Sequence, residues 1–206
     1  MSQDPVKISS DRLLLCEGKT TLLVLGPFCR KLDIQGFQPL DFGSKDNFGN
    51  FLKDVAILPG FAAQVHTIAI VRDAENDAAA AFASVRQSLA DVGLPMPNTP
   101  GEVAGDGRRV GVFIVPDNTA SGMIETLCMR SVASDPAFSC IDQFFECVVQ
   151  RVDVHPTNMH KARAQAFLAT RQNVDYHVGR AADAGIWNFE HEAFAPLEQF
   201  LRKLAA

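Results

Sequence analysis

Residues 66–75 read HTIAIVRDAE, a short apolar run that ends in two acidic side chains. The run from His66 to Arg72 has the length and the aliphatic side chains of a strand that is buried on both faces. Three further runs share these properties and end at polar or turn-forming residues: Arg12 to Cys16, Phe37 to Phe42, and Val110 to Val115. The sequence therefore predicts four buried strands.

The segments between these runs have apolar residues at helical spacing, as at Phe48, Leu52 and Val55. Strands that alternate with helices predict right-handed crossovers and an α/β fold with a mainly parallel four-stranded sheet flanked by helices. The helical segment after the first strand contains Gly26-Pro27, which should end or kink a helix there. The Pro- and Gly-rich stretch 93–109 is expected to be an exposed loop.

Beyond the fourth strand the sequence is helical in character. Asp135-Pro136 is typical of a helix start, and two more helices are expected, one after Thr157 and one beyond residue 193. We predict an α/β core over residues 1–133 and a helical C-terminal extension over residues 134–206 that packs on the core as one compact unit. Trp187 is expected to seal this extension onto the sheet.

The composition excludes disorder, coiled coil and collagen, because 47% of the 206 residues are hydrophobic and only 21% are charged. The net charge of −5 gives no overall basic field for long nucleic acid. A phosphate-bearing partner would have to meet a local patch or a bound cation. The chain has no run of about 18 apolar residues, and its polar start MSQDPVKISSDR lacks a signal-peptide core. We expect no membrane span and no secretion.

The five cysteines are odd in number, lack a CxxC pair and lie among apolar residues. This usage favours buried reduced thiols and a cytoplasmic location over a disulfide framework. Cys140 and Cys147 are seven residues apart, so we expect them to share the core-facing side of one helix.

Acidic side chains follow the predicted strands where each strand ends. Glu17 follows the first strand, Asp73 and Glu75 the third, and Asp117 the fourth. In an open parallel sheet, ligands bind outside the carboxyl ends of the strands. Carboxylates that meet there repel one another unless a cation lies between them, and oxygen ligands suit Mg²⁺ or Mn²⁺. We predict a metal site made of Glu17, Asp73 and Glu75, with Asp117 and Glu125 as further candidates.

The alternative is that these acids cap helices, since Asp and Glu are favoured near helix N-termini. We assign capping to Asp46 and Asp77. Glutamate is a poor N-cap, and three acids from two neighbouring strands exceed what capping needs, so the three principal candidates are assigned to function. For the two further candidates both roles stay open.

Two of these motifs, LLLCEG at 13–18 and VRDAE at 71–75, resemble those of the TOPRIM fold. That fold is shared by topoisomerases, DnaG-type primases, overcoming-lysogenization-defect (OLD) nucleases and recombination proteins. Nearly the whole chain resembles a narrower TOPRIM-like family of bacterial proteins, the DUF3226 group. The resembling stretches are CEGK at 16–19, QPLDFGSKDN at 38–47, IAIVRDAE at 68–75, PDN at 116–118, SGMIE at 121–125 and GIWNFEHEAF at 185–194.

The resemblance implies that Glu17 acts as general acid or base while Asp73 and Glu75 hold Mg²⁺ against a phosphodiester. Glu75 stands where aspartate is commoner in TOPRIM proteins, and its extra methylene shifts the ligand geometry. The candidate phosphate contacts are the cationic side chains nearest these motifs, Lys19, Lys45 and Arg72. The alternative is that these three are solvated flanking charges.

Two functions are consistent with the sequence. The first is a Mg²⁺-dependent nuclease or other phosphotransfer enzyme of TOPRIM type that acts on a phosphodiester or a nucleotide. The second is a non-catalytic metal-binding or regulatory module whose helical C-terminal part recognises a protein partner. The acidic net charge disfavours an independent grip on long nucleic acid, but a nucleotide substrate or a basic protein partner would be compatible with it.

Overall fold

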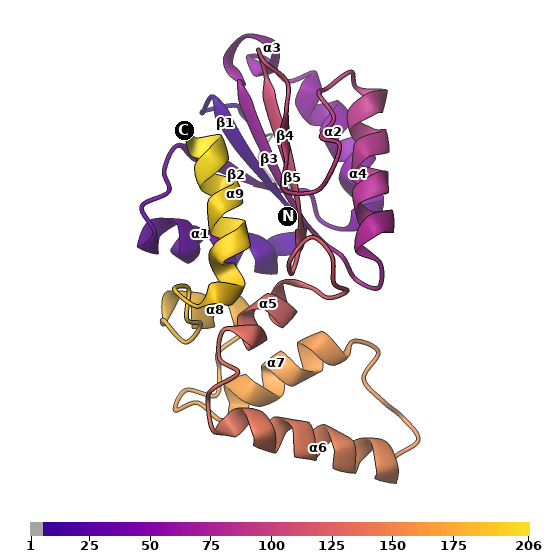
Figure 1. Cartoon of the computed structure of the whole chain (residues 1–206), viewed down its shortest axis with the longest axis vertical. Helices are drawn as coiled ribbons and strands as arrows, with labels where there is room; N and C mark the ends of the chain where they lie inside the picture. Colours follow the sequence, from indigo (N-terminus) through magenta and orange to yellow (C-terminus); the bar gives the residue numbers. More distant parts are fainter. Residues whose placement is uncertain (1–5) are drawn as a thin grey trace.

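The computed structural model describes residues 6–206, so the first five residues of the polar start, MSQDP, lie outside it. A five-stranded sheet forms the centre of the molecule, in the order β2-β1-β3-β5-β4 (Figure 1). The strands are β1 (Arg12–Cys16), β2 (Phe37–Asp41), β3 (Thr67–Asp73), β4 (Val103–Ala104) and β5 (Arg109–Val115). The four predicted strands are confirmed to within one residue at each end, and they pair in parallel.

The fifth strand corrects the prediction of a four-stranded sheet. β4 lies inside the stretch 93–109, which the sequence indicates as a loop, and it pairs antiparallel with β5. Only Val103 and Ala104 take part, opposite Gly111 and Val110. Two residues are too few to produce a periodic pattern, so their Pro- and Gly-rich surroundings dominate the sequence signal.

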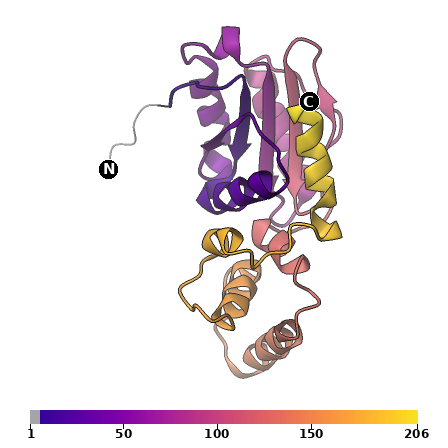
Figure 2. The ribbon, with the colours of Figure 1, turned by 90° about the vertical axis from the view of Figure 1, so that its left-hand side faces the viewer.

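Helices cover both faces of the sheet (Figures 1 and 2). Alternate strand residues point to opposite faces; Leu13 and Leu15 join one apolar cluster, and Leu14 and Cys16 join the other. The first cluster is closed by α2 (Phe48–Ala56), the short α3 (Phe61–Gln64) and α4 (Ala78–Asp91). The second is closed chiefly by α1 (Gly18–Lys31) and α9 (Ala195–Ala205).

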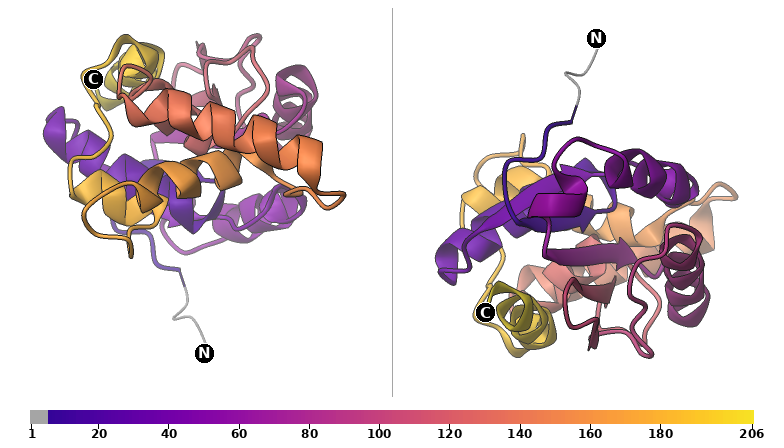
Figure 3. Two further views of the ribbon diagram at one scale, coloured as in Figure 1. Left: turned by 90° about the horizontal axis from the view of Figure 1, so that it is seen from below. Right: turned by 90° about the horizontal axis from the view of Figure 1, so that it is seen from above.

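Several helices extend beyond one end of the sheet, and all but the first of them belong to the predicted helical extension (Figures 1 and 2). Seen from below, they lie in front of the sheet (Figure 3, left). They are α5 (Ile124–Arg130), α6 (Ala137–Arg151), α7 (Met159–Ala169) and α8 (Val178–Asp183). α8 packs against α1, and α9 returns to lie over β5 and β3. The C-terminal part of the chain therefore supplies a layer of the sandwich in addition to its outlying helices. Within residues 6–206, none of the helices combines the length and apolarity needed to cross a bilayer.

Two local expectations about packing concern Trp187 and Gly26-Pro27. Trp187 is buried, stacks on Phe167 at a ring-centroid distance of 5.7 Å, and donates its indole N–H to the carbonyl of Val178 at 2.9 Å. Both partners belong to the extension itself, Phe167 to α7 and Val178 to α8, so the seal onto the sheet stays a prediction. Gly26-Pro27 is expected to end or kink the first helix; it does not end it, because α1 continues through Pro27 to Lys31, and the kink stays a prediction. Burial of Phe28 on the core side offsets the backbone hydrogen bond that proline cannot donate.

All five cysteines are free thiols, but they are not all buried. Cys16 and Cys128 are buried and Cys29 is half-buried, whereas Cys140 and Cys147 are exposed. The expectation that these last two face the core is wrong. α6 turns its Ile141 and Phe145 side inward, and the two cysteines lie on the opposite side of the helix.

Gly179 provides a test of how the extension is attached. A Cβ at this position would lie 2.5 Å from Cβ of Leu23 on α1, which is closer than real Cβ atoms approach one another. We expect Gly179→Ala to push α8 away from α1 and to lower the free energy of unfolding by about 1–3 kcal/mol, measured by urea denaturation.

The matched control is Gly26→Ala on α1, where the new Cβ meets only the mobile end of Arg30 at 3.5 Å. Helix propensity should make that variant neutral or more stable by up to about 1 kcal/mol. Equal effects of the two substitutions would contradict a tight α1–α8 contact.

Candidate functional site

The pairing of β1 with β3 brings the first two candidate acids together. The strands are parallel and in register, with Cys16 opposite Val71, and the N–H of Glu17 donates to the carbonyl of Val71 at 3.0 Å. Glu17 therefore leaves β1 beside the last residue of β3, which is Asp73. Gly18 follows with a φ of +74°, a conformation that glycine adopts without strain, and this turn starts α1 at once.

The Glu17 carboxylate is held by backbone and side-chain donors. Its Oε2 accepts from the N–H of Asp73 at 3.3 Å and lies 3.5 Å from Nε of Arg72, while Oε1 accepts from the N–H of Lys45 at 3.1 Å. Burial raises the pKa of Glu17, and the charge of Glu75 adds to the increase. Arg72 and the two N–H groups oppose this increase, so the carboxyl is fixed in place while its affinity for a proton is increased.

Asp73, the last residue of β3, is enclosed by the protein. The residue is only 6% exposed, and its Oδ1 accepts a hydrogen bond from the N–H of Ile124 at 3.0 Å. Burial raises the pKa of Asp73 well above its usual range, and the neighbouring charges of Glu17 and Glu125 raise it further. This carboxylate lies where negative charge is unfavourable unless a cation is near.

Glu125 lies in the first turn of α5, directly after the residue that donates to Asp73. It is 3% exposed, and its Oε2 has no hydrogen-bond partner. Burial raises the pKa of Glu125, and Lys161 and His160 on α7 oppose the increase. A buried carboxylate oxygen without a hydrogen-bond partner is costly and rare. Glu125 lies beside Asp73. From the sequence alone, its role stays open between helix capping and metal binding.

Glu75 is held in an unusual backbone conformation. Its φ is +52°, a region that non-glycine residues seldom adopt, and its N–H and C=O both bond to Gly122 at 2.8 Å. The side chain forms an ion pair with Nζ of Lys45. Lys45 thus contacts Glu17 through its backbone and Glu75 through its side chain. We refer to Glu17, Asp73, Glu75 and Glu125 as the acid cluster.

The cationic candidates are placed differently from one another. Arg72 is 6% exposed and donates to the carbonyl of Ala81 at 3.2 Å, so it is a buried counter-ion of Glu17 and does not reach the surface as the expected phosphate contact. Lys19 lines a hollow of about 460 Å³ together with Glu125 and Lys161. Lys161 was missed by the sequence reasoning, because it lies on α7 and only the tertiary fold brings it to the strand ends.

The remaining acidic candidate, Asp117, lies in a hydrogen-bonded turn after β5. Asp117 accepts from the N–H groups of Thr119 and Ala120 and pairs with Arg130 at 2.6 Å. Partial burial opposes ionisation, but these donors hold the pKa of Asp117 well below its usual range. It stands outside the acid cluster, with its carboxylate engaged by this turn.

The two predicted helix caps have different outcomes. Asp77 caps α4, as expected, by accepting from the N–H of Ala80 at 2.9 Å. Asp46 lies inside the 3₁₀ turn Lys45–Asn47 instead of at a helix cap, so that assignment is wrong. The turn is only three residues long and runs straight into α2, with Asn47 at the boundary.

The acid cluster has the oxygen donors that Mg²⁺ or Mn²⁺ prefers, and the unpartnered oxygen of Glu125 beside Asp73 is a donor that such an ion could use. Within residues 6–206, no three His, Cys, Asp or Glu side chains are close enough to enclose an ion as they stand. The side chains are of the right chemical type for a divalent cation, but they would have to turn toward an ion in order to bind it.

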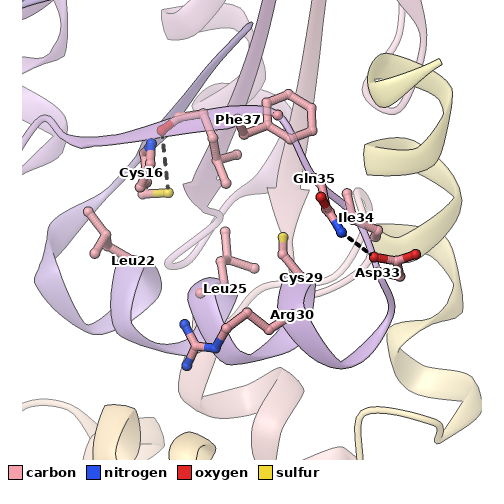
Figure 4. Close-up of a pocket in the computed structure, with 13 residues that line it drawn as sticks. Cys16, Leu22, Leu25, Cys29, Arg30, Asp33, Ile34, Gln35 and Phe37 are labelled. Carbon is pink, nitrogen blue, oxygen red and sulfur yellow. Dashed lines mark hydrogen bonds between the residues drawn. The ribbon is translucent and has the colours of Figure 1, made fainter. Parts of the chain in front are cut away.

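A second hollow, of about 490 Å³, lies between α1 and β2 (Figure 4). Its lining is apolar apart from Arg30, Asp33 and Gln35, and it includes the thiols of Cys16 and Cys29. Burial raises the pKa of Cys29 to about 11, so this thiol stays protonated at neutral pH. None of the acid cluster lines this hollow, so the chemistry predicted from the sequence lies elsewhere.

Comparisons with known proteins agree with this architecture. A family model described as "Protein of unknown function (DUF3226)" matches residues 11–206, and no curated protein matches the chain. The C-terminal region of the Burkholderia pseudomallei OLD protein is similar with a TM-score of 0.52 and 16% identity, over 97% of this chain and 100% of that chain. The C-terminal region of the Xanthomonas campestris pv. campestris OLD protein, phased with mercury, gives 0.51 and 15%, over 95% and 97%. At these identities the likeness shows the fold alone, and it agrees with the predicted α/β class, a mainly parallel sheet flanked by helices.

The buried charge of Asp73 makes a prediction about pH and stability. A carboxyl whose pKa is raised in the folded state stabilises the protein at low pH, and that contribution is lost as the pH rises through the folded pKa. We expect Asp73→Asn, which can still accept from Ile124, to be more stable than wild type at pH 8 by about 1–3 kcal/mol. The gain should shrink as the pH falls toward 4.

Thermal melts of both proteins between pH 4 and pH 8, without divalent cations, provide the measurement. A stability difference that stays constant with pH, or a variant that is less stable throughout, would show that Asp73 is not a strained buried charge.

Proposed function

Because the chain belongs to the DUF3226 family, whose description assigns no activity, its function must be inferred from the site itself. We propose that the protein is a divalent-cation-dependent enzyme that transfers or hydrolyses phosphoryl groups, acting on a phosphodiester or a nucleotide. The observation that carries this proposal is the pair of buried, mutually repelling carboxylates of Asp73 and Glu125, one of which has an oxygen without a partner.

A divalent cation would relieve this repulsion directly. Asp73 and Glu125 would hold Mg²⁺ or Mn²⁺, and Glu75 would join them from the same edge of the sheet. When bound, such an ion neutralises the charge of a phosphate and stabilises the attacking or leaving oxygen. The acids alone cannot do this, since they repel a phosphate.

Glu17 is suited to move a proton. Burial raises its pKa, which brings the carboxyl closer to the range where a general acid or base is effective near neutral pH. The N–H groups of Lys45 and Asp73 hold both carboxylate oxygens in place, and the nearby guanidinium of Arg72 stabilises the ionised form. The side chain is therefore oriented before any substrate arrives.

The hollow beside Glu125 supplies positive charge for the substrate. Lys19 from α1 and Lys161 from α7 both line it, together with Glu125 of the acid cluster. A phosphate placed there would lie between these cations and the acid cluster. This local patch supports a phosphate-bearing substrate in a chain whose net charge is −5.

A binding module is the second candidate, and one observation favours it. One side of α6 carries the exposed Phe144, whose exposed fraction is 54%, together with the exposed Cys140 and Cys147. Apolar side chains that gather on an exposed surface mark interaction sites. In this alternative the acid cluster would hold a cation without turnover, and α6 would contact a protein partner.

The two functions are separated by an activity assay. The purified chain should cleave single-stranded DNA, double-stranded DNA, RNA or a nucleotide in the presence of Mg²⁺ or Mn²⁺ and lose this activity with a chelator. We expect Glu17→Gln and Asp73→Asn each to lower the rate by about 100-fold or more, because general acid–base and metal-ligand roles are of that size.

Asp77→Asn is the matched control, since it removes a carboxylate four residues from Asp73 while asparagine caps a helix as well as aspartate does. It should retain the wild-type rate. Turnover that persists unchanged in Glu17→Gln, or that is absent from every protein with every metal, would favour the binding module.

A further inference from the structure

Lys45 connects two acids that come from different strands. It lies in the 3₁₀ turn that follows β2, and its backbone N–H donates to Oε1 of Glu17 at 3.1 Å. Its Nζ forms an ion pair with Oε2 of Glu75, beyond the end of β3. One residue therefore positions Glu17 and neutralises Glu75 at the same time.

The two ion pairs of the acid cluster differ in how exchangeable they are. Arg72 and Glu17 have side chains that are only 7% and 10% exposed, so this pair is enclosed by the protein. Lys45 and Glu75 have side chains that are 45% and 38% exposed. An ion pair as open as this one contributes little to stability, and another cation from solvent can replace it.

The ammonium group of Lys45 occupies the coordination space of a carboxylate that belongs to the proposed metal site. A carboxylate oxygen engaged by an ammonium at ion-pair distance is poorly available to a divalent cation that needs direct contact at about 2.1 Å. Lysine is a single flexible charge and can turn away without moving the backbone. Its backbone bond to Glu17 would then remain in place.

We propose that Lys45 and the divalent cation compete for the carboxylate of Glu75, so that metal binding releases Nζ toward the phosphate of the substrate. This inference rests on the proposed function, because it requires that the acid cluster binds a divalent cation. It gives Lys45 two successive roles: counter-ion of Glu75 first, and phosphate contact once the cation has arrived.

The exchange couples the two ligands of the site. A phosphate that binds Nζ removes the competitor of the metal, and a metal that displaces Nζ makes it available to the phosphate. By thermodynamic linkage the two effects on affinity are equal. Metal and phosphate should therefore bind with positive cooperativity that depends on Lys45.

Calorimetric titration with MnCl₂ tests the competition without any need for turnover. We expect Lys45→Gln to bind Mn²⁺ with a Kd about 1.5- to 5-fold lower than wild type, the range typical of an open ion pair. Lys53→Gln, which removes the same charge from the exposed side of α2, is the matched control and should leave the Kd within error of wild type.

The same titration in a protein that already carries Glu75→Gln tests whether Glu75 is the carboxylate for which Lys45 and Mn²⁺ compete. In Glu75→Gln, the further change Lys45→Gln should no longer lower the Kd for Mn²⁺, because the competed carboxylate is gone. A circular dichroism spectrum and a thermal melt of each variant show that it is folded before titration.

The possible failures are distinguishable. Equal Kd values for wild type and Lys45→Gln, weaker binding by Lys45→Gln, or an equal gain in Lys53→Gln would overturn the competition and leave the metal site standing. If neither wild type nor Lys45→Gln binds Mn²⁺, the proposed function and this inference are both wrong.

Discussion

The parallel, in-register pairing of β1 with β3 is the constraint on which the site depends. It sets Cys16 opposite Val71 and so places Glu17 against the N–H of Asp73. Both strands are buried on both faces, which makes a register shift costly, because every apolar side chain would change face. The positions of the two acids are therefore determined by the hydrophobic core and not by any attraction between them.

The charges added around this pair are of two kinds. Arg72 is buried and stays with Glu17, so it serves as a fixed part of the fold. Lys45 is open to solvent and serves as a replaceable partner of Glu75. The helices of the C-terminal part bring the remaining groups: α7 brings Lys161 toward the Glu125 of α5, and α8 holds this end of the molecule against α1. The site is completed by segments that are far apart in the sequence.

Much of the fold and part of the site could be predicted from the sequence. The strands were predictable because each is a short apolar run with acids or turn residues at its end, and the placement of Glu17 beside Asp73 follows from a parallel sheet. The capping role of Asp77 was predictable from its position before a helix. Each of these features depends on local pattern together with one simple rule of topology.

The rest depends on tertiary packing that local pattern does not encode. Arg72 is buried because α4 packs over β3, and the carbonyl of Ala81 on α4 accepts a hydrogen bond from the guanidinium of Arg72. Lys161 reaches the acid cluster only because α7 folds back toward the end of the sheet. The outward direction of Cys140 follows from which side of α6 meets α7, and both sides carry apolar residues. A two-residue strand such as β4 is stabilised by its neighbour, β5, and by nothing in its own sequence.

The central claim is that the acid cluster binds a divalent cation between the ends of β1 and β3 and the start of α5. The most direct test is a crystal of the protein soaked in MnCl₂, with the anomalous difference map recorded to locate manganese. The account predicts a peak within about 2.1–2.3 Å of carboxylate oxygens of Asp73 and Glu125. Anomalous peaks confined to other surface carboxylates, or no peak at these two acids when manganese is in excess, would contradict it.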